Sequence, residues 1–159
     1  MRKAGALLAR RPYSRAELQE RLARFAGELP IDAVLDRLEQ LNLLNDAEYA
    51  YNFAFCHMKQ DGWGPNKIQH SLLRRHVEQK TIEAAIQRAT DELGCETTIE
   101  RYAQEYFSKK GLPADLKTLR RAIAHLGQRG FDEDSIMSVL RRMIPAKLWH
   151  RFETGESIE

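Results

Sequence analysis

The chain of 159 residues has little of what β-sheets, disulfide scaffolds and zinc modules need. Valine occurs three times, and no segment alternates apolar and polar residues for long, which argues against strands. The two cysteines, Cys56 and Cys95, are far apart and match neither a disulfide framework nor a zinc pattern. We therefore interpret Cys56 as a small residue of the core.

Long apolar runs are missing as well. No stretch approaches the roughly 18 residues that predict a membrane span. The segment "AGALLA" near the N-terminus is too short for the apolar part of a signal peptide. We expect a soluble, monomeric protein of the reducing cytoplasm that makes no membrane contact.

Signatures of catalysis and of cofactor binding are also absent. The sequence contains neither of the glycine-rich phosphate loops, GxxxxGK[ST] and GxGxxG, and no GxSxG nucleophile motif. The five histidines are not spaced so that two would share a helix face as metal ligands. We predict no catalytic residue, no metal and no cofactor, and hence a protein that is not an enzyme.

Helical periodicity dominates what remains. Apolar residues recur at i, i+3, i+4 and i+7 in nearly every segment, and the five prolines fall between such segments. Three stretches align with one another: "IDAVLDRL" (31–38), "IEAAIQRA" (82–89) and "IMSVLRRM" (136–143). They are 51 and 54 residues apart, which indicates an internal repeat.

The segments before these stretches repeat in the same way. A second helix precedes each one, in "SRAELQERL" (14–22), "GPNKIQHSL" (64–72) and "DLKTLRRAI" (115–123), and a further helix precedes that. The sequence predicts an all-α protein of three tandem three-helix repeats. We place them at 1–45, 46–94 and 95–145, followed by a C-terminal tail at 146–159.

Local signals mark several helix starts. Ser14 with Glu17, and Thr97 with Glu100, fit the capping box. Pro65 suits a first helical position. The aspartates expected to act as N-caps are Asp46, Asp115 and Asp132.

Aromatic residues stand just before predicted helices. In the alignment, Trp63 of "DGWGP" takes the position of Tyr13, and Phe131 precedes the Asp132 cap. We interpret Tyr13, Trp63 and Phe131 as structural anchors that cover turns. The alternative for Trp63 is an exposed platform for a nucleotide base or a partner protein.

Charge is distributed unevenly, although the net charge is only +2. Basic residues gather in and around the second helix of each repeat, whereas acidic residues gather on the third helices. Such helices could form a positive track for a polyanion or an acidic protein surface, or could simply present a solvated face. The candidate contact residues are Arg74, Arg75, Lys117, Arg120 and Arg121.

Four stretches together resemble one known family. "RPYSRAEL" (11–18), "LDRLEQLNLLNDAEYA" (35–50), "DGWGPNKI" (61–68) and "RGFDEDSI" (129–136) are similar to RecX proteins, regulators of the RecA recombinase. The likeness extends over about residues 3–144. Two departures lie near helix ends: Asn42 and Leu43 replace a usual glycine, and "RRHV" (74–77) replaces a Lys-Gly or similar pair.

The resemblance implies an elongated, curved protein without catalytic activity. It implies a partner, the RecA filament on single-stranded DNA, whose ATP hydrolysis and strand exchange the protein suppresses and whose disassembly it favours. Recombination, DNA repair and the SOS response would then be regulated. The alternative is a helix-turn-helix-like protein that acts directly on single-stranded or duplex DNA. Acids on the third helices argue against sequence reading, but weak contact through the second helices stays open.

Overall fold

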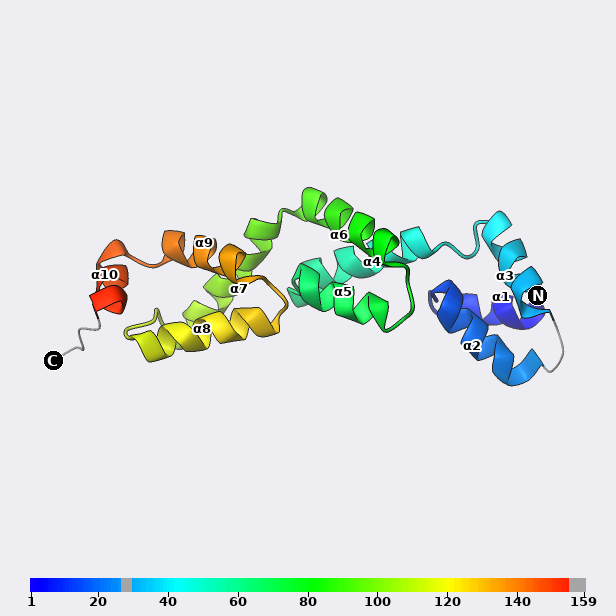
Figure 1. Ribbon diagram of the computed structural model, residues 1–159, viewed down its shortest axis with the longest axis horizontal. Coiled ribbons are helices and arrows are strands. Elements are labelled where there is room, and N and C mark those ends of the chain that lie inside the picture. Colours follow the sequence, from blue (N-terminus) through cyan, green and yellow to red (C-terminus); the bar gives the residue numbers. More distant parts are fainter. Residues whose placement is uncertain (27–29, 155–159) are drawn as a thin grey trace. The chain divides into compact units, whose positions relative to one another are not determined.

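The computed structural model describes residues 1–26 and 30–154, and these consist of helices and their connections without a strand (Figure 1). The prediction of an all-α protein is confirmed. Within the described residues, every helix is too short or too polar to cross a membrane.

The helices follow one another in the order that the repeats predict. The first three are α1 (Arg2–Leu8), α2 (Arg15–Ala26) and α3 (Ile31–Gln40). Next come α4 (Asp46–Cys56), a π-helical turn (His57–Asp61), α5 (Pro65–Leu73) and α6 (Gln79–Leu93). The last are α7 (Cys95–Lys110), α8 (Leu116–Gln128), α9 (Glu133–Met143) and α10 (Ala146–Thr154).

The chain forms two compact units. One comprises Met1–Phe55 and Gln69–Ala89, and the other comprises Cys56–Ile68 and Thr90–Glu159. Helices α5 and α6 each contribute to both units, and the π-helical turn belongs to the second unit. The repeat boundaries proposed from the sequence stay a prediction.

The aligned apolar positions face the interior in each repeat. The third helices of the repeats are α3, α6 and α9. Leu35 on α3, Ile82 on α6, and Ile136 and Leu140 on α9 are all buried. The matching positions of the second helices are also buried, at Leu18, Ile68 and Leu119. The repeated pattern therefore specifies the same inward face three times.

The second unit has a core of its own. Side chains of α7, α8 and α9 meet there, among them Phe107, Leu126 and Leu140. Residues 146–154, expected to be tail, instead form α10, whose Leu148 and Trp149 pack against this core. Pro145 starts the new helix as well as ending the old one, since its carbonyl accepts the amide of Leu148.

Four of the expected helix starts are confirmed, among them Pro65, the first residue of α5. Ser14 and Glu17 form the reciprocal capping box, with hydrogen bonds of 3.1 and 3.2 Å. Asp115 accepts the amide of Thr118, and Asp132 accepts that of Ser135. These bonds to backbone amides lower the pKa of both carboxyl groups.

Two expected starts are wrong. Asn45 caps α4 by accepting the amide of Glu48 at 3.0 Å, whereas Asp46 accepts the amide of Arg15 at 2.7 Å. Helix α7 begins at Cys95, two residues before Thr97, after Gly94 with φ 74°. The start of α4 is set by the neighbouring residue Asn45, because Asp46 is bonded to Arg15 instead. The start of α7 is set by the backbone conformation of Gly94.

The interpretation of Cys56 as a core residue is also wrong, because its side chain is exposed. Ala50, Ala54 and Met58 form the buried stripe of this segment. Cys56 is two residues from both Ala54 and Met58, and so lies on the opposite side.

Helices α3 and α5 end in the same manner, without glycine. Asn42 and His76 have φ of 54° and 56°, in the left-handed region. The amide of Leu43 bonds to the carbonyl of Leu38, and that of Val77 to Leu72. This is the Schellman arrangement, and the two residues occupy the place that glycine usually takes. Asn42 and His76 therefore preserve the turn that glycine forms in the family pattern, but their side chains strain the left-handed backbone conformation.

We expect the substitution His76→Gly to stabilise the protein by up to about 1 kcal/mol, because glycine adopts this conformation without a Cβ clash. The imidazole is exposed, so little packing is lost. Chemical denaturation followed by circular dichroism measures the change. His76→Ala, which keeps a Cβ, is the matched control and should gain nothing; equal stabilities of the Gly and Ala variants would contradict the assignment of strain.

Candidate interaction surface

One junction in the first unit joins the start of α2 to the end of α5. The Ser14 hydroxyl accepts the amide of Glu17 and donates to the carbonyl of Arg75 at 2.7 Å. Ser14 is fully buried. A single hydroxyl thus caps one helix and bonds to a carbonyl that lies beyond the end of another.

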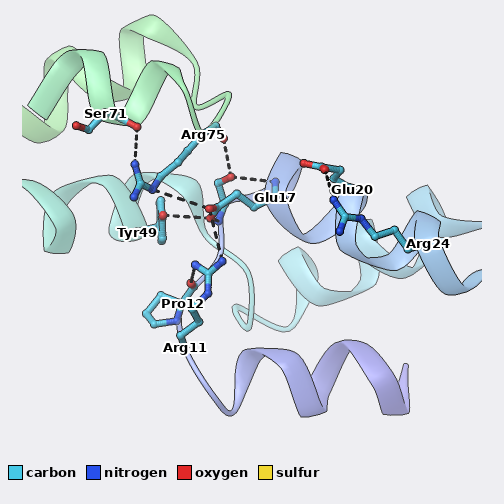
Figure 2. A network of polar contacts seen from close by, with 9 residues as sticks. Arg11, Pro12, Glu17, Glu20, Arg24, Tyr49, Ser71 and Arg75 are labelled. Carbon is cyan, nitrogen blue, oxygen red and sulfur yellow. Dashed lines mark hydrogen bonds and ion pairs between the residues drawn. The ribbon is translucent and has the colours of Figure 1, made fainter.

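An ionic network surrounds this hydroxyl. The Glu17 carboxylate lies 3.7 Å from the Arg11 guanidinium and 3.9 Å from that of Arg75. The Tyr49 hydroxyl donates to the same carboxylate at 3.2 Å (Figure 2). Burial, with the nearby Glu17 charge, raises the pKa of Tyr49 to about 12.

Arg75 therefore has partners within the protein. Its guanidinium also donates to the Ser71 carbonyl at 2.7 Å and lies over the Phe53 ring at 4.7 Å. Its neighbour Arg74 is exposed. Of the two arginines proposed from the sequence, Arg74 is the one that presents its side chain to solvent, and Arg75 holds the junction.

The proposed anchor Tyr13 precedes the same junction. Its ring is 7% exposed and belongs to the core of the first unit. The Arg11 guanidinium covers it at 3.8 Å from the ring centroid. Tyr13 is thus placed between the core and the network around Glu17.

The second unit contains a comparable junction, between the start of α5 and the end of α8. The Gly64 amide donates to the Arg129 carbonyl at 2.7 Å, and the Asn66 amide donates to the Gly130 carbonyl at 3.0 Å. A Cβ on Gly64 would collide with the Gly130 backbone, and one on Gly130 with Lys67. Both glycines are required because two backbones are in direct contact.

Trp63 and Phe131 flank this contact. The Trp63 ring is half-buried, stacks on His57 at 4.2 Å and carries the Lys67 ammonium 4.4 Å from its centroid. Phe131 is 4% exposed and lies in the core of the second unit.

Two arginines secure the π-helical turn in the second unit. Arg101 donates to the carbonyl of Lys59 at 2.9 Å, and Arg129 donates to that of Asp61 at 3.0 Å. A π-turn leaves such carbonyls without their usual α-helical donors. Sequence reasoning missed these bonds, because they join residues more than 40 positions apart.

The remaining proposed contact residues lie together on α8. Lys117, Arg120 and Arg121 are exposed at i, i+3 and i+4 spacing, and so share one face. Leu119, Ala122 and Leu126 form the buried face of the same helix. We call the three cations the α8 basic face. Arg74 belongs to the other compact unit.

Acidic residues of α3 are partly neutralised. The Arg15 guanidinium lies 2.7 Å from both Asp36 and Glu39. The hydrogen bond that Arg15 donates to Asp36 is the largest cause that raises the pKa of Arg15. Within the described residues, no three side chains of His, Cys, Asp or Glu are placed to hold a metal ion.

Comparison with known proteins places the chain in a family. A Regulatory protein RecX of Chromobacterium violaceum is 36% identical over 141 residues, which cover 87% of this chain and 86% of that protein. The chain belongs to the RecX family. A second RecX protein, from Pseudomonas syringae pv. tomato, is 32% identical over 84% of each chain. The model "RecX, second three-helix domain" matches residues 45–86.

Solved structures support the fold. The crystal structure of RecX from Lactobacillus salivarius gives a TM-score of 0.79 at 20% identity, covering 89% of this chain and 92% of that one. A second RecX crystal structure gives 0.70 at 17% identity, over 84% of this chain and 66% of its own. The curated relatives are named regulatory proteins, so the family's role is regulatory.

We expect Gly64→Ala to destabilise the protein by about 1–3 kcal/mol, because its Cβ would push two backbones apart. Gly127→Ala is the matched control. A Cβ at Gly127 meets nothing within 4 Å, and alanine in a helix is favoured over glycine by up to about 1 kcal/mol. Urea denaturation of both variants measures the difference. Equal stability of Gly64→Ala and the parent would contradict the tight junction.

We expect Tyr49→Phe to cost about 1 kcal/mol at neutral pH, since a hydrogen bond to a carboxylate is lost. The folded pKa of about 12 lies above the ordinary value of 10.0. The phenol's contribution to stability is therefore complete below about pH 10 and is lost as the pH rises through about 12. Denaturation at neutral and alkaline pH checks this, with Tyr106→Phe as the control. An unchanged stability of Tyr49→Phe at neutral pH would show that the hydrogen bond from Tyr49 to Glu17 contributes nothing to the free energy of unfolding.

Proposed function

We propose that this protein is an inhibitory regulator of the RecA recombinase filament on single-stranded DNA. It suppresses ATP hydrolysis and strand exchange and favours disassembly, and thereby limits recombination and repair in the cytoplasm. The observation that carries the proposal is the 36% identity with a Regulatory protein RecX over most of both chains. No catalytic step is assigned to its own side chains.

The α8 basic face supports this proposal. Three cations on one exposed helix face suit an acidic surface, and charge complementarity raises the rate and specificity of association. Arg74 adds a further exposed cation in the first unit. We propose Lys117, Arg120, Arg121 and Arg74 as filament contacts, and we assign Arg75 to the junction with Glu17 instead. Several weak contacts on one chain would add through effective concentration.

Direct action on DNA is the competing function. It predicts tight binding to bare single-stranded or duplex DNA that weakens steeply with salt and needs no recombinase. Filament regulation predicts that binding to bare DNA is weak and that tight binding requires recombinase. Binding to bare DNA measured over a range of salt concentrations separates the two.

The double substitution Arg120→Glu/Arg121→Glu should raise the concentration that half-inhibits RecA ATP hydrolysis by roughly tenfold, equivalent to ~1.4 kcal/mol. The matched control, Lys80→Glu/Arg141→Glu, makes the same change in net charge at exposed positions of α6 and α9. Circular dichroism verifies that both variants fold. Equal inhibition by the two variants would remove α8 from the contact, and no inhibition by the parent would overturn the function itself.

A further inference from the structure

Two adjoining hollows lie between α7 and α8 in the second unit. The first has a volume of about 310 Å³ and is lined by Tyr102, Glu105, Tyr106, Lys109, Lys110 and His125. The second, of about 190 Å³, shares Tyr106 and Lys110 and adds Thr118 and Arg121 among its lining. Both hollows are lined by Tyr106 and Lys110, and we call the two together the α7–α8 hollow.

Stacked rings build one wall of the α7–α8 hollow. His125 stacks on Tyr106 at 4.7 Å and on Tyr102 at 6.0 Å. The Arg129 guanidinium lies 4.3 Å from the centroid of Tyr102 and extends the stack. Tyr106 is half-buried, and Phe107 meets it edge-on at 5.6 Å. The rings are therefore fixed by their neighbours while part of Tyr106 still faces the hollow.

Positive charge surrounds this aromatic wall. Lys109, Lys110 and Arg121 line the hollow, against one lining carboxylate, Glu105. Glu105 is paired with Lys109 at 2.9 Å, and this ammonium lowers the pKa of the carboxyl group. Lys110 and Arg121 are exposed and make the second hollow positive.

We propose that the α7–α8 hollow is a nucleotide subsite, in which a base stacks against Tyr106 beside His125 and its phosphate meets Lys110 and Arg121. A nucleotide combines a flat apolar face with an adjacent anion, which is the pairing that this wall and these cations offer. A bare polyanion would gain nothing from the rings. An apolar peptide would leave the cations unused.

The subsite goes beyond the proposed regulation and can be tested without recombinase. Its nucleotide could belong to a single strand of DNA or be free in solution, and both share the chemistry of base and phosphate. Both hollows are partly open to solvent, so a nucleotide within a strand can enter as well as a free one.

The test uses the full chain and a short fluorescein-labelled oligothymidylate at low salt, followed by fluorescence anisotropy. Tyr106→Leu keeps apolar volume but loses the π-face, and should weaken binding about tenfold. Tyr106→Phe keeps the ring and should bind like the parent. Thermal denaturation of each variant verifies that the fold is retained. Equal binding by the Leu and Phe variants would overturn the proposal.

Three further measurements separate recognition of the base, recognition of the phosphate and the source of the nucleotide. An oligonucleotide of the same length without bases should bind about tenfold more weakly than oligothymidylate, and equal binding would overturn the subsite. Lys110→Ala should lower the slope of log affinity against log salt by about 0.7, as expected for one lost phosphate contact on a single strand. If thymidine monophosphate competes as well as unlabelled oligothymidylate at the same total concentration of nucleotides, the site is assigned to free nucleotides. Weaker competition would assign it to a strand.

Discussion

The contact between the start of one second helix and the end of the next second helix is the constraint on which the rest of the fold depends. In the first unit a side-chain hydroxyl, that of Ser14, meets the carbonyl of Arg75. In the second a backbone amide, that of Gly64, meets the carbonyl of Arg129. The two donors differ, but both acceptors are backbone carbonyls at a helix end that have no intrahelical donor. A three-helix repeat of about 50 residues buries a small share of its surface and is marginally stable by itself, so these bonds also join repeats that stabilise one another.

Such junctions divide the arginines into two classes. Arg75, Arg101 and Arg129 donate to backbone carbonyls and are committed to structure. The α8 basic face, by contrast, lies on the side of the helix away from the core. Composition counts both classes equally and so overstates the positive surface available to a partner. The cations suited to recognition are those that the fold does not already use.

The sequence predicted whatever depends on neighbours a few residues away. Helical periodicity identified the inward faces of all three repeats, and the i, i+3 signal at Ser14 and Asp132 identified two helix starts. Features set by distant residues could not be read in this way. Asp46 is taken by an amide 31 positions away, and the π-helical turn shows no pattern in its letters. The α8 basic face was visible because helical spacing alone defines it, whereas the internal role of Arg75 depends on Glu17 and could not be seen.

The glycines beside Trp63 show how such long-range constraints reach the candidate surface. Gly62 has a φ of 63° and is packed so closely on the Tyr102 ring that a Cβ would collide with it, and Gly64 is pressed against Gly130. These residues are small because other groups occupy the space, so the segment is tight rather than flexible, and the Trp63 ring covers it. Helix α8 is consequently fixed at both ends, by the Asp115 cap at its start and by the Gly64 contact at its end. A binding face carried on a helix held in this way keeps its side chains in place before a partner arrives, which lowers the entropic cost of association.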